Sequence, residues 1–305
     1  MKPSQLQAFA AVAAHQSIRG AARALGVSQP AVTRIVRELE REVDAPLVER
    51  SLKGVTLTEY GQAFAPRARQ LLEDMRRARD EILQMREGVR GRVTLAVSTA
   101  VALTLLPPAF KTFHARLPGV DVRFHEVTMP GMLAQLTDGR LDFVVSHVLP
   151  ASLPEDFVAE ELFPVRLVVG LRRMHPLRRA TRLQELHGAE WVLPADDSVG
   201  GHAISPVFSA SGLPVPARVV QGQSVSVALG LISQTDLVGL FVEPLLPLFK
   251  HYGVRRLVLD HALPAIPVCV ITRRGRALTP VAQQFVAGVR AEAQARAGAQ
   301  AQAVG

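Results

Sequence analysis

Two short amphipathic segments at residues 17–39 constrain the fold of this chain more than any other feature. Apolar residues recur in both at the spacing of a helix face, at Ile18, Ala21, Ala22 and Leu25 and then at Val32, Ile35, Val36 and Leu39. Ser17 and Ser28 stand where they would cap the two helix starts, and Gly26-Val27 predicts a tight turn between the helices. Two helices joined in this way form a helix-turn-helix, which predicts sequence-specific binding to duplex DNA.

The polar side chains of the second predicted helix have the chemistry to contact DNA. Gln29 opens this helix, and its amide can make two hydrogen bonds to adenine, so we expect it to read bases. Pro30 is tolerated in the first turn, where its missing N–H costs little. Thr33 and Arg34 follow one turn later, within reach of base edges or phosphates.

A predicted β-hairpin follows at residues 47–57, where two short extended pieces flank Lys53-Gly54. A hairpin beside a helix-turn-helix is a wing, and Arg50 and Lys53 would lie along a phosphate backbone. Together with Arg37 they are expected to position the protein without selecting sequence; a solvated charge is the alternative for Arg37 and Arg50. The residues expected to contact DNA are Ser28, Gln29, Pro30, Thr33, Arg34, Arg37, Arg50 and Lys53.

A long helix is predicted from Thr58 to about Gly88. Its apolar residues repeat every 3.5 residues over three heptads, at Phe64, Ala68, Leu71, Met75, Ala78, Ile82 and Met85. The narrow stripe, flanked by Arg and Glu, favours a helix packed against a partner helix over an amphipathic helix lying on its own domain.

Composition supports a globular protein with an anionic partner. The 305 residues are 48% apolar and 20% charged, with a net charge of +8. Residues 1–92 hold 16 Lys and Arg against 11 Asp and Glu, a net of +5, whereas the rest holds 19 against 16, a net of +3. The single cysteine, Cys269, excludes an internal disulfide, and it stands in an apolar run that predicts burial. No signal peptide or membrane-spanning run is recognisable, so we expect a cytoplasmic protein without membrane contact.

The chain changes character at Arg92, where strands and helices begin to alternate. The first series predicts strands at 93–97, 120–126 and 141–146 and helices at 100–116, kinked or broken at Pro107-Pro108, and at 131–137. The second predicts strands at 165–170, 191–193, 217–221 and 238–241 and helices near 203–211 and 225–233. This alternation indicates a parallel, doubly wound sheet in two α/β units, a bilobed binding module with a cleft. The Ala- and Gln-rich end, residues 291–305, is expected to be frayed.

Helix starts at the ends of strands are the expected ligand contacts of such a sheet. Ser98-Thr99 ends the first strand and begins a helix, whose free N–H groups suit a carboxylate or sulfonate. Residues 198–201 and Ser224 precede two further helices and are placed to face the same cleft. We therefore expect an anionic effector held by Ser98, Thr99 and backbone N–H groups; the alternative is that these hydroxyls only cap helices.

The first 61 residues contain five characteristic segments: LQAF at 6–9, AARALGVSQPAV at 21–32, LE at 39–40, LVER at 47–50 and GVTLTEYG at 54–61. With these segments, and with the long helix and α/β units that follow, the chain resembles the LysR-type transcriptional regulators over nearly its full length. Within the family it is most similar to regulators of aromatic-acid or sulfonate catabolism. The resemblance implies an α/β protein with an N-terminal winged helix-turn-helix, a long linker helix and a bilobed effector domain like that of a periplasmic binding protein.

The resemblance also implies a domain order, partners and contacts. Residues 1–58 would bind DNA, 59–90 would pair two chains, and 91–305 would bind the effector, with lobe I at 91–164 and 267–305 and lobe II at 165–266. The implied partners are double-stranded promoter DNA, a small effector such as an organic acid or sulfonate, further copies of the chain in a dimer or tetramer, and RNA polymerase. The expected effector contacts are Ser98, Thr99, Ala100, Thr128, Met129, Ser146, His147, Val199, Gly200, His202, Ser224 and Phe241.

Three other functions are less well supported. A solute-binding protein would fit residues 92–290, but it would explain neither the winged helix nor the missing secretion signal. A non-regulatory DNA-binding protein would leave the second α/β unit unexplained. An enzyme is disfavoured because the nine histidines show no HxxxH or HExxH spacing and no Gly-rich phosphate loop is present, so we expect no catalytic residue, metal or cofactor.

Overall fold

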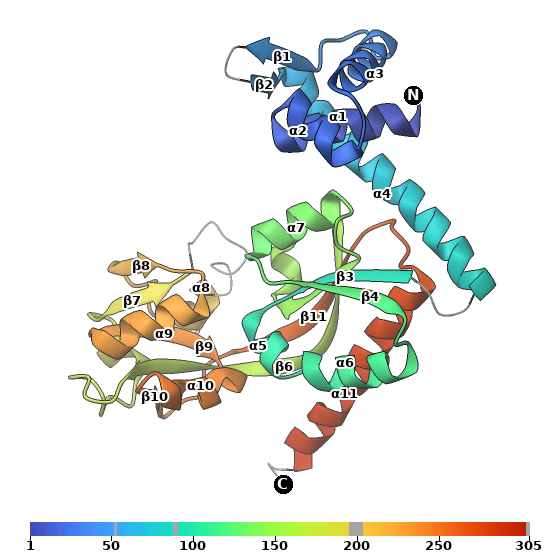
Figure 1. The fold of residues 1–305 in the computed structure, drawn as a ribbon. Helices are drawn as coiled ribbons and strands as arrows, with labels where there is room; N and C mark the ends of the chain where they lie inside the picture. Colours follow the sequence, from blue (N-terminus) through green and yellow to red (C-terminus); the bar gives the residue numbers. More distant parts are fainter. Residues whose placement is uncertain (52–53, 88–90, 195–203, 303–305) are drawn as a thin grey trace. The chain divides into compact units, whose positions relative to one another are not determined.

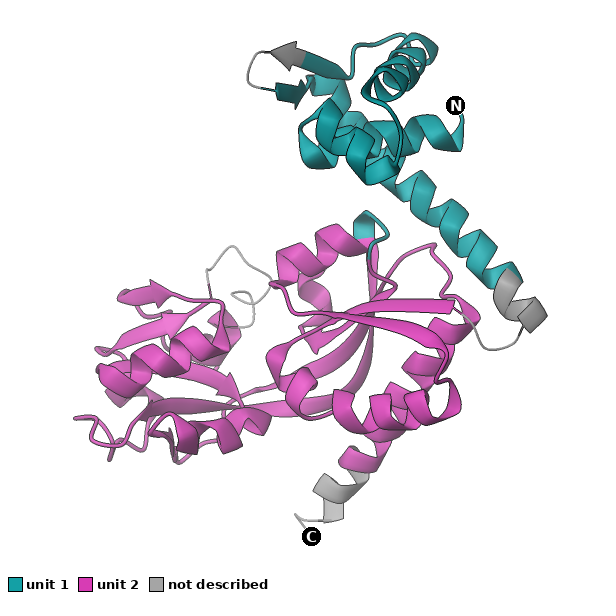
Figure 2. Ribbon diagram, in the orientation of Figure 1, with its two compact units in different colours: residues 1–88, 137–140 teal, residues 89–136, 141–305 magenta. Residues whose placement is uncertain are grey.

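The computed structural model describes residues 1–51, 54–87, 91–194 and 204–302. The chain forms two compact units (Figure 2): Met1–Gly88 with Thr137–Arg140, and Val89–Leu136 with Leu141–Gly305.

The first unit is a winged helix-turn-helix followed by a long helix (Figure 1). Its elements are α1 (Pro3–His15), α2 (Ile18–Leu25), α3 (Gln29–Glu42), β1 (Val48–Ser51), β2 (Gly54–Leu57) and α4 (Glu59–Glu87). Strands β1 and β2 pair antiparallel, as predicted for the wing. The prediction of a helix-turn-helix with a hairpin is confirmed.

The caps and turn of the helix-turn-helix are those that the sequence predicts. The Ser17 hydroxyl accepts a hydrogen bond from the Gly20 N–H at 3.2 Å, and the Ser28 hydroxyl accepts one from the Ala31 N–H at 3.3 Å. Gly26 ends α2 in the left-handed conformation, with φ at 67°, which glycine adopts without strain. On the apolar face of α2, Ala21 and Ala22 are buried, whereas Leu25 in the last turn is 37% exposed.

Two side chains fix the wing to the helices. The Glu40 carboxylate accepts hydrogen bonds from the Leu47 and Val48 N–H groups at 2.9 and 3.1 Å. The Thr58 hydroxyl donates to the Pro46 carbonyl at 2.6 Å and accepts from the Gly61 N–H at 3.0 Å, so it also caps α4. The hairpin is therefore held in a set orientation beside α3.

Gly61 packs directly against this junction, and we expect Gly61→Ala to destabilise the first unit. A Cβ at position 61 would lie 2.0 Å from the Leu47 carbonyl oxygen, so the backbone of the wing or of α4 must shift. The expected cost is about 1–3 kcal/mol, measured by urea unfolding of the full chain. Gly230→Ala is the matched control. A Cβ there meets nothing within 4 Å inside α9 (Val225–Gln234), so the helix should gain about 0.5–1 kcal/mol. Equal stability of the two variants would contradict this packing.

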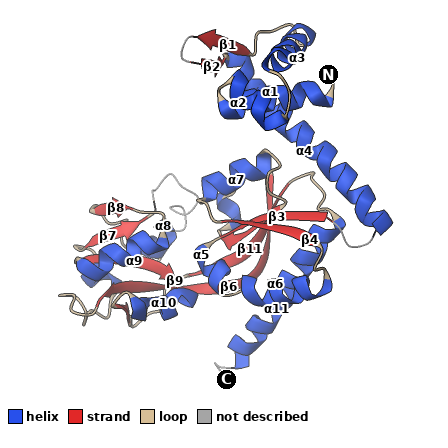
Figure 3. Cartoon of the chain, viewed as in Figure 1, coloured by secondary structure: helices blue, strands red, loops and turns tan. Residues whose placement is uncertain are grey.

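The second unit is built on one nine-stranded sheet within the described residues (Figure 3). Its strands are β3 (Gly91–Val97), β4 (Val120–His125), β5 (Phe143–His147), β6 (Phe157–Arg172), β7 (Glu190–Leu193), β8 (Val219–Gln221), β9 (Leu237–Val242), β10 (Val254–Leu257) and β11 (Ala265–Arg273). Its helices are α5 (Thr99–Leu103), α6 (Leu106–Arg116), α7 (Met129–Thr137), α8 (Ser205–Ser209), α9, α10 (Leu246–His251) and α11 (Pro280–Gln302). Short 3₁₀ turns lie at Pro150–Ser152, Leu183–Leu186 and Glu243–Leu245.

The sheet is mixed rather than wholly parallel, which corrects the prediction. Strand β3 is parallel to β4 and β5, and β7 is parallel to β8 and β9. The 16-residue strand β6 runs through both lobes and pairs antiparallel with β11, β9 and β10. The antiparallel pair of β6 and β11 joins the lobes, and the α/β alternation alone cannot reveal it.

Helices cover both faces of the sheet in each lobe. In lobe I, α6 and α11 bury Phe113 and Phe285 against one face, and α7 buries Met132 and Leu136 against the other. In lobe II, α8 packs on one core, and α9 and α10 pack on a second. The fold is therefore an N-terminal helix-turn-helix followed by a bilobed α/β domain, as predicted.

Several predicted bounds differ for local reasons. The helix expected at 100–116 is broken, as the two prolines indicated, but the break lies at Thr104-Leu105, so that the prolines fall in the first turn of α6, where they are tolerated. The helix near 203–211 is described only over α8, and α10, β10 and β11 were not predicted. The end of the chain is not frayed over 291–302: α11 continues to Gln302, because Ala293 is buried against lobe I and the Arg296 guanidinium donates to the Thr104 carbonyl at 2.7 Å.

Candidate DNA-binding and effector sites

One face of α3 carries the residues that the sequence predicts for base contact. Val32, Val36 and Leu39 are fully buried on the opposite face, so the helix is anchored by its apolar stripe. The predicted contacts that the structure leaves exposed on or before α3 are Ser28, Gln29, Pro30, Arg34 and Arg37, while Thr33 is half-buried.

The charges on α3 are free to move toward a phosphate. The Arg34 side chain is 76% exposed, and its nearest carboxylate is that of Glu38 at 3.9 Å. An exposed pair of this kind stabilises a helix by only a few tenths of a kcal/mol, so DNA can replace it at little cost. Arg50 lies on β1, where it pairs with Val55, and Lys53 lies outside the described residues.

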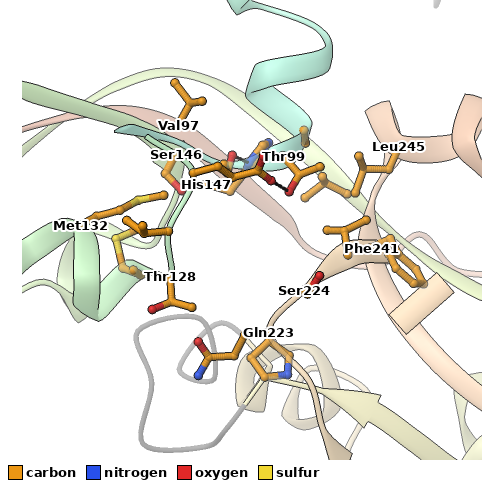
Figure 4. A pocket seen from close by; sticks show the side chains of 18 of the residues that line it. Val97, Thr99, Thr128, Met132, Ser146, His147, Gln223, Ser224, Phe241 and Leu245 are labelled. Carbon is orange, nitrogen blue, oxygen red and sulfur yellow. Dashed lines mark hydrogen bonds between the residues drawn. The ribbon is translucent and has the colours of Figure 1, made fainter. Parts of the chain in front are cut away.

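A cavity of about 840 Å³ opens in the second unit at the carboxyl ends of β3, β4 and β5 (Figure 4). These three strands are parallel, so their ends meet at one edge of the sheet. The starts of α5, α7 and α9 and the end of β9 complete the wall. The predicted effector contacts that line the cavity are Ser98, Thr99, Ala100, Thr128, Met129, Ser146, His147, Ser224 and Phe241. Val199, Gly200 and His202 lie outside the described residues.

Ser98 and His147 are hydrogen-bonded to each other in the cavity wall. The Ser98 hydroxyl and the Nδ1 of His147 are 3.1 Å apart, so Ser98 makes no side-chain cap on α5. Burial lowers the pKa of His147 to about 4, because the protonated ring would lose its hydration. His147 is therefore uncharged at neutral pH and serves as a hydrogen-bonding group rather than as a cation.

The neutral state of His147 predicts a pH dependence of folding. Between pH 6.5, the ordinary pKa of the ring, and about pH 4, the unfolded chain binds a proton at this site and the folded chain does not. This contribution to stability is therefore complete above pH 6.5 and falls as the pH drops toward 4, by at most ~1.4 kcal/mol per pH unit. Urea unfolding of wild type and His147→Gln between pH 7 and 4 measures it, and the variant should show the shallower slope. A ring that titrates near 6.5 by NMR would contradict the prediction.

Glu126, which the sequence analysis missed, brings a carboxylate to the same wall. It follows β4, lines the cavity, and accepts a hydrogen bond from the Thr99 hydroxyl at the start of α5. The helix start that was expected to hold an anionic group thus already faces a carboxylate of the protein. Its position directly after a strand that ends at the cavity was the one signal available in the sequence.

The described residues do not meet the requirements of a metal site, a reactive thiol or a membrane-spanning helix. They contain no group of three or more His, Cys, Asp and Glu side chains that could hold a metal ion. Cys269 is buried, and burial, reinforced by the negative charge of Glu161, raises the pKa of its thiol to about 12. No helix in the described part of the chain is both long enough and apolar enough to cross a membrane.

Comparison with known proteins matches both units. The family model described as "Bacterial regulatory helix-turn-helix protein, lysR family" matches residues 3–62, and "LysR substrate binding domain" matches residues 86–294. The regulator GbpR of Rhizobium radiobacter is 30% identical over 77% of this chain and 79% of its own. The regulator PcaQ of Agrobacterium fabrum is 31% identical over 75% of this chain and 74% of its own.

Solved structures share the fold. The crystal structure of CbnR, a LysR family transcriptional regulator, superposes with a TM-score of 0.71 over 96% of this chain and 99% of its own, at 23% identity. Full-length CbnR has also been solved in complex with its target DNA, with the same TM-score.

Proposed function

This chain belongs to the LysR family of bacterial transcriptional regulators, and on that premise we propose that it binds promoter DNA through α3 and responds to a small organic effector in the cavity of its second unit. The observation that carries the proposal is the exposed polar face of a capped and anchored α3. Gln29 and Arg34 on that face offer the hydrogen bonds that read base edges. Arg37, together with Arg50 and Lys53 of the wing, would contact phosphates.

We assign the domains as the sequence predicts: residues 1–58 to DNA binding, 59–90 to pairing and 91–305 to the effector. The pairing assignment is supported by apolar side chains of α4 that the single chain leaves uncovered. Leu71, Met75 and Ile82 are 42%, 49% and 58% exposed, and they belong to the 3.5-residue repeat. A second α4 would cover this stripe in a dimer and set two recognition helices about 34 Å apart, the spacing of successive major grooves on one face of DNA. Two such dimers would form a tetramer.

Control by the effector requires different affinities for two arrangements of the protein. A ligand in the cavity contacts both lobes, because Ser98 and Ser146 belong to lobe I and Ser224 and Phe241 to lobe II. Ligand binding would therefore favour one lobe arrangement, and with it one spacing of the DNA-binding units. In this proposal the chain regulates transcription in the cytoplasm and catalyses no reaction.

Footprinting of the DNA upstream of the protein's own gene, with and without candidate effectors, tests this function. We expect a protected site with pseudo-two-fold symmetry whose length or bending changes when an effector binds. Failure to protect any site would overturn the DNA-binding role, and identical footprints in all conditions would overturn effector control.

A further inference from the structure

The charges around the cavity are unusual for a site that would bind an anion. Glu126 is the one charged residue of the described lining, which includes neither lysine nor arginine. His147 adds no positive charge at neutral pH, because burial holds its pKa near 4. A bound carboxylate or sulfonate would therefore meet repulsion from Glu126 without a cationic side chain to offset it.

The carboxyl end of β5 brings a serine to the cavity wall. Ser146, at the carboxyl end of β5, is 4% exposed and lines the cavity (Figure 4). Its hydroxyl is a lining group that can both donate and accept a hydrogen bond, so it can pair with a polar group of a ligand in the cavity.

The remaining polar groups of the wall match a ligand that both donates and accepts. Thr128 and Ser224 offer hydroxyls and Gln223 offers an amide, all of them uncharged. The backbone N–H groups at the starts of α7 and α9 add donors, whereas Glu126 only accepts. A ligand ammonium group would leave the protein's donors unused, and a ligand carboxylate would leave Glu126 facing a like charge. A ligand hydroxyl satisfies both kinds of group.

We propose that the effector is an uncharged compound bearing several hydroxyl groups, and that Glu126 selects it over organic anions by accepting a hydrogen bond from one of those hydroxyls. This inference rests on the proposed effector control, and it revises the expectation of an anionic ligand at Ser98 and Thr99. Ser146 and Gln223 take part in binding on the other sides of the cavity.

Calorimetric titration of the full chain without DNA tests the proposal with matched compounds. Each set consists of a neutral sugar or polyol, the acid of the same skeleton and the corresponding amino sugar, for example glucose, gluconate and glucosamine, with a pentose set beside it. We expect at least one neutral member to bind roughly tenfold or more tightly than its acid and its amine. The proposal would be overturned if the acid or the amine of each set bound more tightly than the neutral member, or if no neutral compound bound.

Variants separate the role of Glu126 from general charge effects. Glu126→Gln should lower the affinity for the neutral compound and raise the affinity for its acid. The preference for the neutral member should therefore fall roughly tenfold. Glu155→Gln, which removes an exposed carboxylate outside the cavity lining, should leave that preference unchanged. An unchanged preference in Glu126→Gln would overturn the assignment. Because the titration contains no DNA, its result is independent of the footprint: a protein that selects neutral ligands but protects no site would contradict the proposed function and not this inference.

Discussion

Replacing Met75 and Ile82 with glutamate is expected to turn the protein into monomers and to reduce its affinity for a two-half-site operator roughly 100-fold or more. These side chains are 49% and 58% exposed in the single chain and lie on the repeat that a partner helix would cover. Two glutamates from each chain would place four carboxylates in one apolar interface. Burying these charges without a cationic partner costs free energy, and this cost opposes pairing. A monomer binds only one half-site at a time, so the affinity that a dimer gains by binding both half-sites at once is lost.

Analytical ultracentrifugation and operator titrations of the same samples measure both effects. The matched control is Met75→Leu with Ile82→Leu, which keeps the stripe apolar and should preserve both the assembly and the affinity. Circular dichroism should show all three proteins folded, because neither position belongs to the core of the first unit. A glutamate variant that stays dimeric would contradict the assignment of α4 as the pairing helix.

The second large effect is expected at the start of the recognition helix. Gln29→Ala removes an exposed amide that we expect to make two hydrogen bonds to one adenine, and leaves the Ser28 cap and the apolar anchor intact. Discrimination at one base pair of each half-site should therefore fall by about 1–3 kcal/mol, while the fold is unchanged. Binding to a library of operators, each with one base pair replaced, measures this directly.

Arg37→Ala gives the contrasting control on the same helix. Its side chain is exposed and is expected to contact phosphate. Its loss should therefore lower the affinity for all operators alike and reduce the slope of log affinity against log salt concentration by about one. A Gln29→Ala protein that keeps the wild-type order of preference across the library would show that Gln29 does not read a base.

The helix-turn-helix was predictable because its determinants are local. Ser17, Gly26 and Ser28 act on residues within one or two turns, and the buried stripe of α3 repeats at helical spacing. The cavity wall was predictable for a similar reason: strand ends of a parallel sheet converge, so Ser98, Thr128 and Ser146 meet although they are far apart in the sequence.

What the sequence did not reveal depends on pairing between distant segments. Strand β6 begins eight residues before its predicted start at Val165, because the stretch with Glu160, Glu161 and Pro164 pairs with β11. Pro164 sits opposite Pro267, so two residues without N–H groups share one position of the ladder. Likewise, nothing near Glu126 in the sequence shows that its carboxylate accepts a hydrogen bond from Thr99, and this carboxylate places a negative charge in the cavity wall.

The most direct test of regulated, sequence-specific binding is a competition titration of the full-length protein on a labelled fragment from upstream of its own gene. The unlabelled competitors are the same fragment and a shuffled fragment of equal length and composition, each assayed with and without a bound effector. We predict that the native fragment competes at least ~10³-fold better than the shuffled one, and that the effector changes this ratio or the shape of the complex. Equal competition by the two fragments in every condition would contradict the central claim.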